Sequence, residues 1–260
     1  MNTSVVSGEP PLVHLDIVRV SVLRPLKWLR LGWRDMRTAI SLSYGVLVMA
    51  MGWTLLVVLG SHPYFVAAAI SGFLLVGPLM SAGLCEMSRR YSLGQTASFD
   101  ESLEGFARNA PALYAFGAIL AICAIVWFAV SALLLGTVFH VAAPNVRETL
   151  YIGFVDASNA AQVYAYVTVG GLMAAAVFAV SVVAIPLMID RHATAAEAMR
   201  GSLKVVFSNI PAMLLWSLLI LVLTIIGFAT FLVGLMFTVP LLGHATWHAY
   251  KDLIAEELHK

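Results

Sequence analysis

Charged residues are scarce in this sequence. Of its 260 residues, 11% are Asp, Glu, Lys or Arg, whereas 61% belong to the apolar set AVILMFWYC. A soluble domain of average composition has about 25% charged residues, so this chain has too few to cover a surface exposed to water. Its 15 basic and 14 acidic residues nearly balance, which argues against the basic surface of a nucleic-acid-binding protein. The composition predicts an integral membrane protein whose first partner is the lipid bilayer.

Four long stretches contain no charged residue at all. They are 48, 38, 33 and 46 residues long and cover residues 38–85, 109–146, 157–189 and 205–250. A transmembrane helix needs about 20 residues, so we expect two spans in each of the longest stretches and one in each of the others. Unbroken apolar runs also exclude an outer-membrane barrel, whose strands alternate apolar and polar residues. The sequence therefore predicts an all-α protein with six spans, at residues 42–59, 65–85, 112–139, 163–189, 212–228 and 231–250. The first hairpin is expected to turn at residues 60–63, and the last to break between Gly227 and Gly234.

The distribution of Lys and Arg predicts an orientation. With six spans, 14 of the 15 basic residues lie on the side of the two termini, and only Arg147 lies on the other side. Basic residues concentrate on the cytoplasmic side of membrane proteins. We therefore expect a bacterial inner (plasma) membrane protein with both termini in the cytoplasm. It would comprise a flexible N-terminus (residues 1–25), a membrane domain (26–255) and a short cytoplasmic tail (256–260).

Residues 26–40 combine apolar and basic residues at helical spacing. Apolar side chains recur in steps of three and four, and basic side chains do the same on an adjoining stripe. This pattern is typical of a helix that lies among lipid headgroups, although a basic flank that stops transfer of the first span is the alternative. The predicted lipid-facing residues are Lys27, Trp28, Arg30, Trp33, Arg34 and Arg37.

Two polar segments end in a similar pattern. Ser102–Leu113 and Ser202–Met213 share Ser, Leu, Asn, Pro and Ala at a constant offset of 100 residues. Ser98 and Glu101 have the spacing of a capping box, which predicts the start of a short helix. We therefore predict three hairpin repeats, each with an amphipathic cytoplasmic helix, a span out and a span back; the alternative is that Pro and Asn are simply common at span ends. A Pro followed by Leu marks the end of each returning span, at Pro78, Pro186 and Pro240.

The usual signatures of catalysis are missing. The sequence has no G-x-S-x-G, no Walker loop, no G-x-G-x-x-G and no H-E-x-x-H motif. No ionisable residue lies at mid-membrane depth in the predicted spans, which argues against ion-coupled transport. We therefore expect that the protein is not an enzyme and that it has no cofactor.

The strongest candidates for a binding site are His244 and His248. Their spacing of four places both imidazole rings on one face of the last predicted span. Asp35, Glu86 and Asp190 are predicted at the same membrane surface and could supply carboxylate ligands. A metal or haem site is one interpretation, and polar residues at the membrane interface are the other.

Three motifs resemble a family of uncharacterised bacterial integral membrane proteins, known only as a domain of unknown function. The motifs are Gly32–Arg37, Gly72–Leu79 followed by Ser88–Arg90, and Gly243–Leu253. The resemblance covers roughly residues 28–255 and implies a six-helix inner-membrane protein without an established activity.

Three functions are compatible with these features. The leading hypothesis is a non-enzymatic interaction or assembly factor for another membrane complex, or for copies of itself. The alternatives are a carrier or pore for a neutral or lipid-like solute, and a protein that binds metal or haem through His244 and His248.

Overall fold

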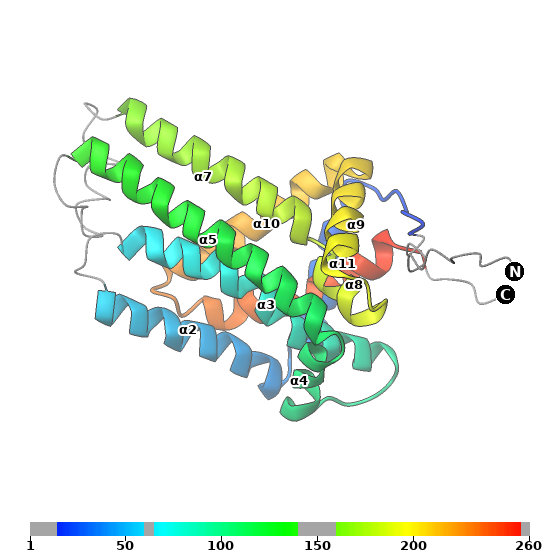
Figure 1. The fold of residues 1–260 in the computed structure, drawn as a ribbon. Helices are drawn as coiled ribbons and strands as arrows, with labels where there is room; N and C mark the ends of the chain where they lie inside the picture. The colour runs from blue at the N-terminus through cyan, green and yellow to red at the C-terminus, as the bar shows by residue number, and fades with distance from the viewer. Residues whose placement is uncertain (1–14, 60–64, 140–159, 256–260) are drawn as a thin grey trace, which may run out of the picture.

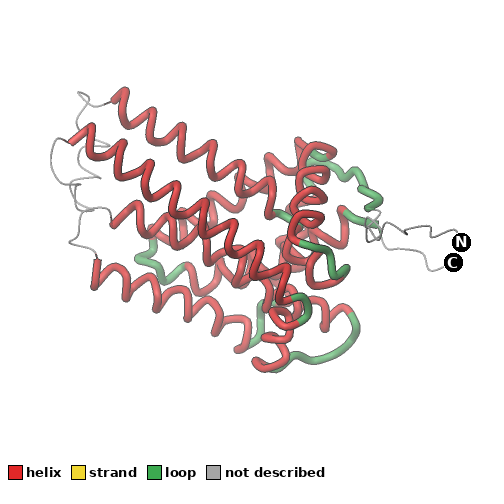
Figure 2. The backbone as a smooth tube through the Cα atoms, viewed as in Figure 1, coloured by secondary structure: helices red, strands yellow, loops and turns green. Residues whose placement is uncertain are grey.

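The computed structural model describes residues 15–59, 65–139 and 160–255. Within these ranges the chain forms helices joined by short loops (Figure 2). The one isolated β-bridge among the described residues pairs Ile17 with Ile254. The fold is therefore all-helical, as the apolar runs predict. The helices are α1 (Arg24–Asp35), α2 (Ala39–Leu59), α3 (Phe65–Ser92), α4 (Phe99–Ala107), α5 (Ala110–Phe139), α7 (Ala160–Ser181), α8 (Ala184–Asp190), α9 (Ala195–Ser208), α10 (Ile210–Ala229) and α11 (Leu235–Leu253).

The long helices run side by side, and the short helices gather at one end of the bundle (Figure 1). This end contains α1, α4, α8 and α9 together with the last turns of α3 and α11, and it is called the polar end below. Four stretches are long and apolar enough to cross a membrane, namely Ala39–Val58, Ala110–Leu134, Tyr164–Asp190 and Ile210–Ala229. These stretches match four of the six predicted spans. The other two, 65–85 and 231–250, correspond to α3 and α11, and their crossing of the membrane stays a prediction.

The structure adds detail to two of the predicted spans, whose membrane boundaries stay predictions. Helix α3 continues beyond the predicted span 65–85 as far as Ser92, because its polar last turns are stabilised by contacts at the polar end. The predicted span 163–189 consists of two helices, α7 and α8, with a break at residues 182–183. Pro186 explains the break, since it has no N–H to donate to the carbonyl of Val182.

Helices α3 and α11 lie at the centre of the described bundle and pack closely against each other. A Cβ atom at Gly243 of α11 would collide with Leu84 of α3, and the Cys85 Sγ atom lies 3.7 Å from the Gly243 carbonyl oxygen. Near the start of α11, Gly45 of α2 fits against the backbone of Met236, where a side chain would not fit. Glycine thus allows three helices to approach closely.

The last hairpin turns where the sequence predicts it. The break between α10 and α11 covers residues 230–234, inside the predicted interval from Gly227 to Gly234. Thr230 stabilises this turn, because its hydroxyl donates to the Ile226 carbonyl oxygen at 2.9 Å and accepts from the Gly234 N–H at 2.8 Å. The turn predicted at residues 60–63 lies outside the described residues.

Both ends of the described chain meet at the polar end. The Val18 N–H donates to the Leu253 carbonyl oxygen at 2.9 Å, and the Ala255 N–H donates to the Asp16 carbonyl oxygen at 3.0 Å. Asn209 also accepts from the Val20 N–H at 2.9 Å. These bonds hold residues 16–20 in place, although they belong to the segment predicted to be flexible. Residues 1–14 and the tail 256–260 lie outside the described residues.

Candidate functional site

Polar side chains are buried where α3 and α11 meet at the polar end. Glu86 and Ser88 of α3 and His244 of α11 are at most 1% exposed, and Asp35 of α1 is 6% exposed. Burying such groups costs free energy unless each finds a hydrogen-bond partner. The structure provides these partners in two separate clusters.

The first cluster is a continuous chain of hydrogen bonds through His244. The Nε2 atom of His244 lies 2.8 Å from Ser41 Oγ, and its Nδ1 atom lies 2.8 Å from Ser88 Oγ. Ser88 Oγ donates to Asp35 Oδ2 at 2.8 Å. These hydrogen bonds therefore connect α2, α11, α3 and α1, which come from distant parts of the sequence.

The Asp35 carboxylate, which can only accept, determines which group donates in each hydrogen bond of this series. Ser88 has one hydroxyl proton and gives it to Asp35, so its oxygen accepts from the Nδ1–H of His244. With the proton on Nδ1, the Nε2 atom accepts from the Ser41 hydroxyl. Ser41 in turn accepts from the Thr38 hydroxyl at 2.8 Å. The network thus assigns one tautomer to His244.

Asp35 is the acceptor at the end of the chain and has a second donor. The Nε2 atom of His248 donates to Asp35 Oδ2 at 2.8 Å. Burial by itself would raise the pKa of Asp35, but the hydrogen bonds from His248 and Ser88 outweigh it and lower this pKa below its usual range. Asp35 is therefore held ionised, and it fixes α1 to both α3 and α11.

The structure brings the predicted pair His244 and His248 into one cluster around Asp35. Both ring nitrogens of His244 already bond serine hydroxyls, and His248 bonds a carboxylate. Across the described ranges, no group of three or more His, Cys, Asp or Glu residues is placed to hold a metal ion. Hydrogen bonding accounts for the positions of both rings, and metal or haem binding stays a prediction.

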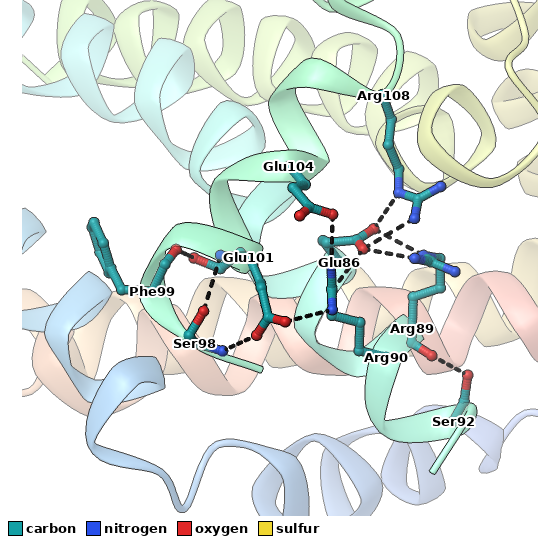
Figure 3. A network of polar contacts seen from close by, with 10 residues as sticks. Glu86, Arg89, Arg90, Ser92, Ser98, Phe99, Glu101, Glu104 and Arg108 are labelled. Carbon is teal, nitrogen blue, oxygen red and sulfur yellow. Dashed lines mark hydrogen bonds and ion pairs between the residues drawn. The ribbon is translucent and has the colours of Figure 1, made fainter. Parts of the chain in front are cut away.

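The second cluster surrounds the fully buried carboxylate of Glu86 (Figure 3). Arg89 donates to its two oxygens at 2.8 and 2.7 Å, and Arg108 donates at 2.7 and 3.3 Å. Arg90 Nε adds a bond of 3.2 Å. Burial opposes ionisation, but Arg89 and Arg108 outweigh it and lower the pKa of Glu86. Glu86 therefore ties α3 to the junction between α4 and α5.

Arg90 extends this cluster to the surface of α4. Its guanidinium group donates to Glu101 at 3.0 Å and to Glu104 at 2.6 Å, as Figure 3 shows. The cluster then contains three carboxylates and three guanidinium groups, so its charges balance. Such internal pairing is typical of a structural element, because no charge is left over for a ligand.

Helix α1 is held against α11 by buried side chains that the sequence analysis did not identify as such. Trp28 is 0% exposed, and its indole N–H donates to Asp252 Oδ2 at 2.8 Å. Arg24 Nε donates to the same oxygen at 2.6 Å. Gly32 lies against the backbone of α11 at Leu241 and Ala245. The prediction that Trp28 faces lipid is therefore wrong, because α11 buries its side chain. The helical pattern of residues 26–40 could not show this contact, since Asp252 lies 224 residues away in the sequence.

The other predicted lipid-facing residues lie at the surface. They are Lys27, Arg30, Trp33, Arg34 and Arg37. The helix predicted over residues 26–40 is nevertheless interrupted, because α1 ends at Asp35 and α2 begins at Ala39. Thr38 explains the new start, since its hydroxyl oxygen accepts the Ser41 N–H at 3.2 Å, one of the unpaired donors of a helix N-terminus.

Helices α4 and α9 begin in the same way. Ser98 and Glu101 form the predicted capping box at the start of α4, which is confirmed. Thr194 and Glu197 form a second capping box at the start of α9. Each helix is followed directly by a long apolar helix, α5 or α10.

The aligned serine and asparagine positions also have similar surroundings. Ser102 and Ser202 are both 0% exposed. Asn109 donates to the Ala193 carbonyl oxygen at 2.8 Å, and Asn209 donates to the Val18 carbonyl oxygen at 3.1 Å. Both asparagines therefore fix a neighbouring backbone segment at the polar end. These coincidences agree with the alignment, whereas a threefold repeat of hairpins stays a prediction.

Sequence reasoning missed the two serines that complete the histidine chain. It placed Asp35 and Glu86 near the histidines, but it gave no role to Ser41 or Ser88. Ser88 carried a weak signal, because it lies two residues after Glu86 in a helix whose last turns are polar. Ser41 carried none, since serine is common in apolar helices, where it often bonds its own backbone.

Comparison with known proteins finds a similar family for the central part of the sequence. No curated protein and no solved structure matches it. Residues 65–190, from the start of α3 to the end of α8, match the model of a family described as "Predicted integral membrane protein (DUF2189)". The match includes Glu86 and Ser88 but not Asp35 or His244. The protein is thus an integral membrane protein whose residues 65–190 are similar to DUF2189, a domain of unknown function.

Proposed function

We propose that the protein is a non-enzymatic interaction or assembly factor for another membrane complex. The observation that carries this proposal is the uncovered outer surface of its apolar helices. In Ala39–Val58, Ala110–Leu134 and Ile210–Ala229, only 22% of the most apolar 18-residue stretch is buried, compared with 50% in Tyr164–Asp190. Three long helices therefore offer apolar faces to lipid or to other membrane helices.

Helix α5 illustrates such a face. Ile122, Ile125 and Leu133 are 61%, 68% and 67% exposed. At about 100° per residue, these three side chains point to one side of the helix. Leu120 and Trp127 are buried toward the bundle. The two buried clusters at the polar end support the proposal further, because they keep this surface in a fixed shape.

We also propose that the chain crosses the bacterial inner membrane six times, as three hairpins, with the polar end in the cytoplasm. Two features support this topology. Both described ends of the chain lie at the polar end, and a capped short helix precedes each of the long helices α5 and α10. The excess of Lys and Arg on the side of the termini supports the orientation.

Cysteine labelling in intact cells tests the topology. In a variant that lacks both native cysteines (Cys85→Ala/Cys123→Ser), single cysteines are introduced as Val233→Cys in the turn between α10 and α11 and as Gln95→Cys at the polar end. An impermeant maleimide should label position 233 in intact cells and position 95 only after permeabilisation. The opposite pattern would contradict the proposed orientation.

Site-specific photo-crosslinking tests the interaction. A photoreactive amino acid replaces Ile125, which is 68% exposed, or Leu120, which is 1% exposed on the same helix. At position 125 we expect one discrete adduct with a second membrane protein, which also copurifies stoichiometrically in mild detergent. Position 120 should give no adduct. The result would argue against an assembly factor if every exposed position tried gave adducts only with lipid or with another copy of the protein.

A carrier for a neutral or lipid-like solute is the second candidate, and one observation favours it. An apolar groove of about 330 Å³ lies between α2, α3 and α4, with Tyr44, Met80 and Leu103 among its lining residues. Reconstituted vesicles that contain the protein should then release or exchange such a solute faster than protein-free vesicles. The variant Leu103→Trp, which fills the groove, should abolish the difference, and an absence of flux across a broad solute panel would exclude this candidate.

A further inference from the structure

The outward face of α1 has a composition that its docking on α11 does not explain. Its buried residues Pro25, Trp28, Gly32 and Asp35 lie within a sector of about 80° around the helix axis. Its exposed residues occupy the opposite side, in a sector of about 120°. These are Leu26, Lys27, Arg30, Trp33 and Arg34. The docked helix therefore presents a basic and aromatic surface outward.

Most of the positive charge on this face, and that of Arg37 just beyond the helix, is not neutralised by the described part of the protein. Among the described residues, no carboxylate lies within 4 Å of Arg30 or Arg37. Arg34 is paired at 3.4 Å with Asp35, but its own side chain is 70% exposed. Lys27 lies at 3.8 Å from Asp252, which already accepts from Arg24. This face thus differs from the Glu86 cluster, in which the charges balance.

The basic face also lies where the chain enters the membrane. Arg37 is two residues before Ala39, the first residue of the span Ala39–Val58. Trp33 is 47% exposed, and the Arg37 guanidinium carbon lies 5.8 Å from the centre of the Trp33 ring. Tryptophan beside arginine is typical of the boundary between lipid headgroups and hydrocarbon.

We infer that the outward face of α1 is a binding surface for anionic phospholipid headgroups in the leaflet next to the polar end. Arg30, Arg34 and Arg37 donate hydrogen bonds to headgroup phosphates, and Trp33 and Leu26 insert between the lipids. Since Trp28, Gly32 and Asp35 hold α1 rigidly, the cations are presented as a preformed row.

Native mass spectrometry of the full chain in mild detergent tests this inference. The probes are dioleoyl phosphatidylglycerol and dioleoyl phosphatidylcholine, which share their acyl chains and differ in net charge. The unmodified protein should bind phosphatidylglycerol more tightly, and added NaCl should reduce the difference. In the variant Arg30→Gln/Arg37→Gln, we expect roughly 30-fold weaker binding of phosphatidylglycerol, or about fivefold for each arginine.

Two matched variants make the result specific. Arg200→Gln/Lys204→Gln removes the same charge from exposed positions on α9 and should change the affinity less than threefold. Arg30→Lys/Arg37→Lys keeps the charge and should retain binding, which shows that the surface still folds. Equal losses in the α1 and α9 pairs, or equal binding of both lipids, would overturn the inference. Unchanged binding in Arg30→Gln/Arg37→Gln would also overturn it and would favour an acidic protein surface as the occupant.

Discussion

The polar end and the outer face of α5 are built from opposite kinds of contact. At the polar end, a few charged and hydroxyl groups are buried in fixed pairs, such as Glu86 with Arg108 and Ser88 with Asp35. On the outer face of α5, large apolar side chains such as Ile125 remain exposed. A polar contact in a buried site constrains distance and direction, whereas an apolar face on a span accepts any apolar neighbour. The difference indicates that the shape of this protein is determined at the polar end.

The largest effect is expected from Glu86→Gln, which removes the charge at the centre of the arginine cluster. Three guanidinium groups would lose their shared partner, so the free energy of unfolding should fall by about 3–5 kcal/mol. Denaturant titration in detergent micelles measures this change. Glu104→Gln is the control, because the Glu104 side chain is 52% exposed and pairs with Arg90 alone among the described residues. It should cost less than about 1 kcal/mol. Equal costs would contradict a special role for the buried cluster.

Two glycine substitutions compare an inner and an outer helix face. Gly45→Ala should destabilise the protein by about 3 kcal/mol, because the new methyl group collides with the backbone of Met236 in α11. Gly171→Ala on α7 meets no other atom within 4 Å and should be neutral or stabilising by up to about 1 kcal/mol. Thermal unfolding of both variants in the same detergent tests the pair. A destabilised Gly171→Ala would show that the outer face of α7 is covered.

Acid should weaken the polar end selectively. Burial by itself would raise the pKa of Asp252, but hydrogen bonds from Arg24 and Trp28 outweigh it and lower this pKa. The pKa values of Asp35 and Glu86 are lowered by their partners in the same way. In the unfolded protein these carboxyl groups titrate near pH 4, so the unfolded state binds more protons below that pH. The stability contributed by these three carboxyl groups should therefore be constant above about pH 5 and should fall as the pH drops further, by up to about 1.4 kcal/mol per pH unit for each carboxyl.

Asp252→Asn provides the comparison for this pH dependence. It removes one of the three carboxyl groups, so the slope of stability against pH should decrease by about one proton. Unfolding measured between pH 7 and pH 3 for both proteins gives the two slopes. Identical slopes would mean that Asp252 does not contribute to acid sensitivity.

The smallest effect is expected from a pair of serines on α2. Ser41→Ala leaves the Nε2 atom of buried His244 without its donor and should cost about 1 kcal/mol. Ser43→Ala, two residues away, removes only an exposed bond to the Ile40 carbonyl oxygen and should change stability by less than about 0.5 kcal/mol. Denaturant titration of both variants distinguishes the sites. If Ser43→Ala costs as much as Ser41→Ala, the histidine chain does not stabilise the bundle.

Local patterns predicted the elements of this fold well. The Ser98 capping box and the break before Gly234 are confirmed, since both depend on residues within a few positions of each other. The prediction for Trp28 was wrong, because periodicity indicates which residues share a helix face but not whether lipid or protein covers that face. The histidine pair was found by its spacing, whereas Ser41 and Ser88 join it only through the packing of α2, α3 and α11.

The sequence by itself determined that this chain lies in a membrane, and where most of its apolar helices begin and end. The 11% of charged residues and the four uncharged stretches are sufficient for that, because the free energy of moving a side chain into lipid depends on its own chemistry. Only the tertiary structure decided which polar groups are paired and which remain available. Asp35 pairs with Ser88 and His248, while Arg30 and Arg37 are left at the surface. Those outcomes depend on distances between residues up to 213 positions apart, which arise only when the helices pack.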